Sequence, residues 1–303
     1  MSEFRSGFVC FVGRPNTGKS TLTNALVGAK VAITSNRPQT TRHTIRGIVH
    51  REDFQIILID TPGLHRPRTL LGKRLNGLVR DTYSEVDVIG LCIPADEPIG
   101  PGDRWIYQQI RDVAPRTTLV VVVTKMDKVA KDRVAAQLMA VQEEFGERAA
   151  EIIPVSATTG EQVDLLTDVL ASRLPPGPAF YPDGELTDEP EEVLMAEFIR
   201  EAALEGVSDE LPHSLAVVIE DIEERQGRAE GDELIDVRAV LYVERDSQKG
   251  IVIGKGGARL REVGTTSRTQ IEKLLGTKVF LELRVKVAKN WQRDPKQLGR
   301  LGF

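Results

Sequence analysis

Hydrophobic residues in the first half of the chain gather into short continuous runs separated by amphipathic stretches. Five runs have the length of strands buried on both faces: residues 8–13, 56–59, 86–93, 119–123 and 152–155. The stretches between them repeat apolar residues at helical spacing, over residues 21–27, 70–83, 103–113, 134–145 and 163–174. Strands that alternate with helices predict an α/β domain with a doubly wound, mostly parallel sheet.

This alternation breaks at Leu174-Pro175-Pro176-Gly177-Pro178, and the acidic, turn-rich segment that follows, 183–190, has no periodicity. Proline and glycine clusters of this kind are typical of linkers between domains. We therefore expect a first domain at residues 1–174, a linker at 175–190 and a second domain at 191–303.

The second domain has a different order of elements. The pattern predicts a helix, two long strands, two short helices and a last strand, over residues 191–204, 214–224, 234–244, 258–263, 266–275 and 278–288. An α-β-β-α-α-β order predicts a small α+β domain with three strands backed by helices.

Composition narrows the class of protein. A chain of 303 residues with 41% hydrophobic and 28% charged residues is globular, which excludes disordered and collagen-like proteins. Cys10 and Cys92 lie far apart inside apolar runs, which favours reduced, buried thiols and a cytoplasmic location. No apolar stretch approaches the roughly 18 residues that a membrane-spanning helix needs. Residues 1–5 lead into a predicted strand without a signal-peptide pattern, so secretion is not expected.

The net charge of −5 is unevenly distributed. Residues 151–250 carry 7 basic and 25 acidic side chains, whereas residues 251–303 carry 12 basic and 4 acidic ones. A basic C-terminal segment behind an acidic one suggests an anionic partner for that end of the chain, with a solvated basic face as the alternative.

A phosphate-binding motif follows the first predicted strand. Residues 13–20 read Gly13-Arg14-Pro15-Asn16-Thr17-Gly18-Lys19-Ser20 and match G-x-x-x-x-G-K-S/T. We expect them to bind the nucleotide together with Thr21, which begins the predicted helix. In such a loop the backbone N–H groups surround the phosphates, Lys19 neutralises them and the Ser20 hydroxyl ligates Mg²⁺. The loop alone does not separate ATP from GTP.

A second motif, Asp60-Thr61-Pro62-Gly63, lies at the C-terminal end of a predicted strand, where ligands of open α/β sheets bind. We expect Asp60 to hold Mg²⁺ through water and the Gly63 amide to sense the terminal phosphate. The segment 34–44 lies where a first switch loop belongs, and a hydroxyl there should complete the Mg²⁺ shell. We favour Thr41, with Thr40 as the alternative.

Two further segments indicate which base of the nucleotide is bound. Thr124-Lys125-Met126-Asp127 resembles the N/T-K-x-D element of GTP-binding domains, and Ser156-Ala157 resembles the S-A element whose amide contacts guanine O6. The Asp127 carboxylate would accept two hydrogen bonds from guanine, and adenine offers neither donor in that place. Because Thr124 replaces the commoner Asn, the bridging hydrogen bonds of an amide should be weakened or replaced.

The basic C-terminal segment contains a glycine motif of another kind. Gly254-Lys255-Gly256-Gly257 forms a G-x-x-G sequence followed by Arg259, and it resembles the loop of a type II KH domain. Such a loop approaches the backbone of about four single-stranded nucleotides while an apolar groove receives their bases. Arg259 is expected to bind RNA through phosphate. Other cations would continue the phosphate contacts or be plain surface charges: Arg261, Arg268, Lys273, Lys286 and Lys289. Trp291 would stack on a base or pack the C-terminal segment.

The full set of motifs resembles the bacterial Era family. The residues that narrow the resemblance are Pro38-Gln39-Thr40-Thr41-Arg42, the D-T-P-G-L sequence at 60–64 and the KH-like segment. It implies a P-loop GTPase domain followed by a KH type II domain, with GTP/GDP and Mg²⁺ as cofactors. Leu64 stands where many GTPases have a water-orienting Gln, so hydrolysis should be slow. Asn16 matches an Asn that holds K⁺ in some GTPases of this group. Alternatively, Asn16 only stabilises the turn.

The resemblance implies a monomeric, GTP-hydrolysing switch that binds the 3′ end of 16S rRNA and assists 30S subunit assembly and rRNA maturation. Two alternatives stay open at this point. One is an RNA-binding module that uses nucleotide only for stability, and the other is a regulatory GTPase peripherally associated with the inner face of the cell membrane.

Overall fold

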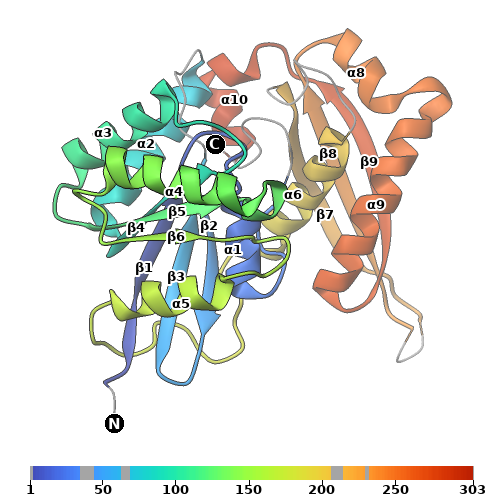
Figure 1. The fold of residues 1–303 in the computed structure, drawn as a ribbon. Coiled ribbons are helices and arrows are strands. Elements are labelled where there is room, and N and C mark those ends of the chain that lie inside the picture. Colours follow the sequence, from blue (N-terminus) through green and yellow to red (C-terminus); the bar gives the residue numbers. More distant parts are fainter. Residues whose placement is uncertain (1–2, 35–43, 63–68, 206–213, 229–231, 303) are drawn as a thin grey trace. The chain divides into compact units, whose positions relative to one another are not determined.

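The computed structural model describes residues 3–34, 44–62, 69–205, 214–228 and 232–302. They divide into two compact units: the first comprises residues up to 188 except 68–71, and the second comprises 68–71 and everything from Glu189 onward. Each unit has its own sheet, drawn in Figure 1.

The first unit contains a six-stranded sheet in the order β2-β3-β1-β4-β5-β6. Its strands are β1 (Arg5–Val12), β2 (Ile45–His50), β3 (Phe54–Asp60), β4 (Val88–Pro94), β5 (Thr118–Thr124) and β6 (Glu151–Pro154). The helices are α1 (Lys19–Val27), α2 (Leu70–Glu85), α3 (Pro101–Val113), α4 (Lys131–Phe145) and α5 (Val163–Ser172). The predicted mostly parallel, doubly wound sheet is confirmed.

Helices cover both faces of this sheet, so the apolar strands are buried on each side (Figure 1). Side chains of α1 and α5 pack on one face, around residues such as Phe11 and Leu58. Side chains of α2, α3 and α4 pack on the other face, around residues such as Ile89 and Val121. Cys10 and Cys92 are free and buried within these layers, and burial raises the pKa of Cys92 to about 12.

The pattern of apolar runs did not reveal β2, the edge strand that pairs antiparallel with β3. Its sequence is short, and Gly47 interrupts the apolar run. Helix α1 explains this glycine, because a Cβ at Gly47 would lie 2.7 Å from Cγ2 of Val27. The close packing of α1 on β2 therefore depends on the residue that obscured the strand.

Part of the predicted linker is bonded to the same edge of the sheet. The buried Gln55 of β3 accepts hydrogen bonds from the amides of Phe180 and Tyr181 at 2.7 and 3.0 Å. The amide of Ile48 in β2 donates to the carbonyl of Leu186 at 2.9 Å. Residues 180–186 thus follow the edge strand.

The second unit contains a three-stranded sheet in the order β7-β8-β9, with β7 and β8 antiparallel and β8 and β9 parallel. Its helices and strands are α6 (Glu191–Leu204), β7 (Ala216–Glu224), β8 (Leu234–Val243), α8 (Asp246–Ile253), α9 (Ala258–Leu275), β9 (Lys278–Val287) and α10 (Pro295–Arg300). The three predicted strands are confirmed to within two residues.

The helices of this unit differ from the prediction in two respects. Helix α8, which ends at Ile253, is absent from the predicted order, and the two predicted short helices form the single helix α9. Trp291 is fully buried, and its indole N–H donates to the Ser214 carbonyl at 2.9 Å. It therefore packs the C-terminal segment and does not offer its ring to a base.

No helix in the part of the chain that the structure describes is long and apolar enough to cross a membrane.

Candidate nucleotide site and nucleic-acid interface

The loop between β1 and α1 has the backbone of a phosphate-binding loop. Asn16 and Gly18 have φ angles of 63° and 92°, in the left-handed region that turns the chain back on itself. Gly13 lies against β4, where a Cβ would approach the Cys92 carbonyl oxygen to 2.8 Å. Helix α1 begins at Lys19, so its N-terminal dipole is directed at the loop.

Lys19 is folded into this loop. Its ammonium group donates to the carbonyls of Gly13 and Arg14 at 3.1 and 2.8 Å, and the residue is 7% exposed. Burial lowers the pKa of Lys19. A nucleotide phosphate bound in the loop would offset this effect of burial, because a nearby negative charge favours the charged form of the lysine.

The two described candidates for Mg²⁺ ligation lie side by side. The Ser20 hydroxyl donates to the carboxylate of Asp60 at 2.7 Å, and Asp60 is fully buried at the end of β3. A hydroxyl and a carboxylate supply the oxygen ligands that Mg²⁺ prefers, so the donor set fits this metal. Thr61 fastens the end of β3 through a hydrogen bond to the Phe11 carbonyl at 3.1 Å. Thr41, Gly63 and Leu64 lie outside the described residues.

Thr124 lacks the amide of the commoner Asn, but its side chain forms another contact, which tethers it to the phosphate-binding loop. Its hydroxyl donates to the Thr17 carbonyl at 2.6 Å, and the side chain is 4% exposed. This bond joins the end of β5 directly to the phosphate-binding loop. Of the two outcomes expected from sequence, weakening or replacement, the structure shows a replacement contact to the loop.

The residues expected to select the base lie around the end of β5. Lys125 has a left-handed φ of 59°, and its ammonium group lies 3.6 Å from the Asp96 carboxylate. Asp127 is exposed in the 3₁₀ turn Met126–Lys128, so its carboxylate is accessible to a ligand. After β6, the Ser156 hydroxyl accepts the Thr159 amide and the Ser156 amide donates to Glu161, which closes the loop that contains Ala157.

The side chain of Arg14 is held by helix α3. Its Nε donates to the Asp103 carboxylate at 2.8 Å, and Nη2 lies 3.0 Å from Glu97. Asp103 is fully buried and also accepts the Gly100 amide at 2.8 Å, which caps α3. The backbone of Arg14 is thus the part that belongs to the phosphate loop. Sequence reasoning missed Asp103 and Glu97, because nothing in their local pattern marks a partner in the loop.

The glycines of the G-x-x-G sequence have distinct surroundings. The loop joins α8 to α9, and Gly254, Gly256 and Gly257 have φ angles of 73°, 60° and 76°. A Cβ at Gly254 would lie 2.7 Å from Cβ of Arg259, whereas Cβ atoms at Gly256 and Gly257 would meet no atom of the described residues within 4 Å. The open side of the loop is therefore formed by Gly256 and Gly257, with the exposed Lys255 beside them.

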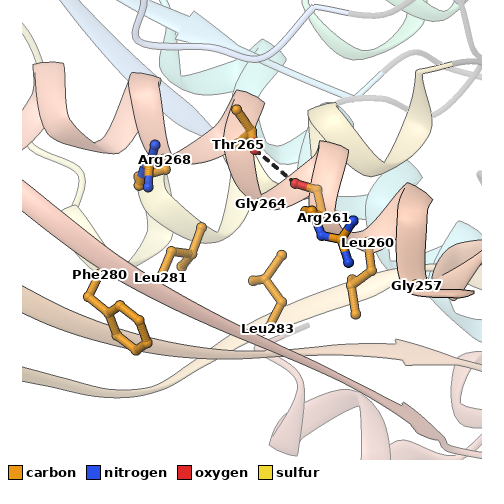
Figure 2. A pocket seen from close by; sticks show the side chains of 9 residues that line it. All are labelled: Gly257, Leu260, Arg261, Gly264, Thr265, Arg268, Phe280, Leu281 and Leu283. Carbon is orange, nitrogen blue, oxygen red and sulfur yellow. Dashed lines mark hydrogen bonds between the residues drawn. The ribbon is translucent and has the colours of Figure 1, made fainter.

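A groove of about 350 Å³ begins at Gly257 and runs between α9 and β9. Figure 2 shows its lining, with Leu260, Leu281 and Leu283 as apolar side chains and the guanidinium groups of Arg261 and Arg268 beside them. Phe280, half exposed, lies at the β9 side. An apolar floor with cations at its rim suits unstacked bases and a phosphate backbone. The sequence suggested such a groove and singled out Arg261 and Arg268, but it did not identify the apolar lining residues.

Comparisons with known proteins agree with this geometry. A family model described as a 50S ribosome-binding GTPase matches residues 8–125, and a KH domain model matches residues 210–292. The protein is therefore a P-loop GTPase that also carries a KH domain.

The relatives identify the family. Proteins named GTPase Era from Mycobacterium sp. (strain JLS) and Mycolicibacterium smegmatis are 84% and 83% identical to the chain, which covers 100% of each. The chain belongs to the Era family of GTPases.

Two solved structures match 99% of this chain over 99% of their own. One is Era in complex with MgGDPNP and nucleotides 1506–1542 of 16S ribosomal RNA, at a TM-score of 0.93 and 35% identity. The other is an Aquifex aeolicus Era variant bound to GDP and AlF₄⁻, at a TM-score of 0.92 and 36% identity. GTP hydrolysis follows from membership of this family of GTPases.

The position of Asp127 predicts a switch in base preference. Asp127→Asn replaces an acceptor with a donor that suits the C2 oxygen of xanthine, so calorimetry should show tighter binding of XTP than of GTP. Asp132→Asn removes the same charge from the exposed start of α4 and should leave GTP preferred. An Asp127→Asn protein that still prefers GTP would refute the base-reading assignment.

The Thr124 tether predicts a loss of nucleotide affinity. Thr124→Val keeps the shape of the side chain but leaves the Thr17 carbonyl without its donor, which typically costs about 1–3 kcal/mol. We expect GTP affinity to fall about ten-fold, the equivalent of about 1.4 kcal/mol. Thr118→Val, at the other end of β5, is the matched control. Equal GTP affinity of the two variants would show that the tether does not support the loop.

Proposed function

We propose that this GTPase binds the 3′ end of small-subunit ribosomal RNA through the groove between α9 and β9. The observation that carries the proposal is the G-x-x-G loop, which opens onto a groove with an apolar floor and a basic rim. Its support from outside the chain is the Era structure that contains nucleotides 1506–1542 of 16S ribosomal RNA.

The nucleotide is assigned to the carboxyl ends of β1, β3, β5 and β6. In this proposal the amides of the phosphate loop and Lys19 hold the phosphates, and the Gly63 amide senses the terminal one. Asp127 and the Ala157 amide read guanine. Ser20, Thr41 and Asp60 hold Mg²⁺, which supplies charge neutralisation at the phosphates when bound. The support is the direct Ser20–Asp60 contact and the Thr124 tether to the loop.

We also propose that K⁺ binds beside the phosphates through Asn16. The left-handed backbone of Asn16 places an amide side chain at the turn of the phosphate loop, and its oxygen is a suitable ligand for K⁺. A cation there would add positive charge at the phosphates. It would not replace a water-orienting Gln, because Leu64 is apolar and gives no hydrogen bond to an attacking water. Hydrolysis by the isolated protein should still be slow.

The RNA target implies the setting in which the protein acts. We propose that it acts as a monomer in the cytoplasm on the 30S subunit and assists subunit assembly and rRNA maturation. Peripheral association with the inner face of the cell membrane is addressed by co-sedimentation with anionic vesicles.

Turnover distinguishes this proposal from an RNA-binding module that uses nucleotide only for stability. Wild-type protein should release phosphate from GTP over many turnovers, slowly, whereas Lys19→Ala should lose tight binding because the buried charge disappears. Lys131→Ala, an exposed lysine of α4, is the control and should behave as wild type. A single turnover without recycling would support the alternative, and a rate on the order of 5 to 20 per second would show that a catalytic group was missed.

The loop predicts a specific loss of RNA binding in Gly257→Asp. Its carboxylate would point into the open side of the loop and repel phosphate, so filter binding to a 16S 3′-end oligonucleotide should weaken strongly. If about four phosphates are neutralised, wild-type protein should show a log–log salt slope near −3, about −0.7 per contact.

Gly257→Asn controls for bulk and backbone strain, because Asn has nearly the same shape and tolerates the left-handed conformation. It should bind RNA better than Gly257→Asp, and both should keep wild-type GTP affinity. Wild-type RNA affinity of Gly257→Asp with an unchanged salt slope would remove this loop from the RNA site.

A further inference from the structure

Arg259 is the first basic side chain of helix α9, but its guanidinium group is bonded to another helix. Its Nη2 donates to the Ala203 carbonyl at 3.2 Å and to the Glu205 carbonyl. These carbonyls lie at the C-terminal end of α6, where a helix leaves acceptors without intrahelical partners and carries a partial negative charge. Arg259 therefore caps α6 with a cation.

The backbone of Arg259 supports the G-x-x-G loop at the same time. A Cβ at Gly254 would lie 2.7 Å from Cβ of Arg259 and 3.0 Å from its backbone nitrogen. The first glycine of the loop therefore rests on the residue whose side chain reaches α6. A single residue connects the loop with the end of a helix more than fifty positions earlier in the chain.

The exposure of the neighbouring cations differs from that of Arg259. Lys255 and Arg261 are exposed, whereas Arg259 is partly buried and its Nε is buried without a hydrogen-bond partner among the described residues. For Nη2 of Arg259 to reach a phosphate, it would have to leave the carbonyl of the buried Ala203 without this donor. Losing the donor of a buried acceptor is costly, which favours the bonded arrangement over a phosphate contact.

We propose that Arg259 is a positioning residue for RNA binding: it fastens the G-x-x-G loop to the end of α6 and does not itself contact phosphate. A loop with three glycines at positive φ has much backbone freedom to lose when it is ordered on a ligand. An anchor present before binding removes part of that cost. The inference rests on the proposed function of this loop and departs from the expectation that Arg259 binds RNA directly.

The salt dependence of binding separates the two roles of an arginine. An arginine that neutralises a phosphate contributes about 0.7 to the log–log slope for single-stranded RNA, whereas a positioning residue changes affinity without changing the slope. Arg259→Met should weaken binding of the 16S 3′-end oligonucleotide about ten-fold with the wild-type slope. Arg261→Met, at the exposed rim of the groove, should reduce the magnitude of the slope by about 0.7.

A second variant guards against misfolding, and GTP affinity checks that the first unit is intact. Arg259→Lys keeps the charge but lacks the planar fork of donors, so it should bind RNA with intermediate affinity and the wild-type slope. Full wild-type affinity of Arg259→Lys would overturn the proposal, because charge alone would then suffice. A reduced slope in Arg259→Met, or unchanged affinity, would also overturn it.

Hydrogen exchange of the RNA-free protein tests the anchor independently of the RNA target. Amides 254–257 and the last turn of α6 should exchange faster in Arg259→Met than in wild type and Arg261→Met. If wild-type protein does not bind the oligonucleotide, the proposed function fails, while the exchange result still decides whether Arg259 holds the loop. Equal exchange in all three proteins would refute the anchor.

Discussion

The close approach of the phosphate loop to the ends of β4 and β5 is the constraint on which the nucleotide site depends. Gly13 lies against the Cys92 carbonyl, and the Thr17 carbonyl accepts the Thr124 hydroxyl. These two contacts fix the loop at both ends. Helix α1 can then begin at Lys19 and place Ser20 against Asp60. Sheet packing, and not the loop sequence alone, therefore sets the geometry for phosphate and metal.

Charge on the second unit is distributed differently from what the sequence totals suggest. Several cations of the basic segment are paired with the acidic segment before it, as Lys286 is with Glu220 at 2.9 Å and Lys278 is with Asp232 at 2.8 Å. Arg238 of β8 lies 2.5 Å from Asp221 of β7. Exposed pairs of this kind add little stability, but they neutralise cations that would otherwise bind anions non-specifically. Lys255 of the G-x-x-G loop and Arg261 at the rim of the groove remain exposed.

The sequence predicted the elements whose signal is local and missed those that depend on distant partners. Buried strands and motif loops have continuous patterns, so the sheet of the first unit and the backbone of the phosphate loop could be predicted. Strand β2 was missed because Gly47, which makes room for the packing of α1, interrupts its apolar run. The directions of Arg14 and Arg259 were missed because Asp103 and Ala203 lie 89 and 56 positions away in the chain.

The central claim is that one chain combines a GTPase site with a groove for the 3′ end of small-subunit ribosomal RNA. Ultraviolet crosslinking in cells, followed by sequencing of the RNA bound to the purified protein, tests it most directly. We expect reads concentrated at the 3′ end of 16S rRNA, at sites contacted by residues of α9 and β9. Reads spread over messenger and transfer RNAs, or no enrichment over an uncrosslinked sample, would contradict it.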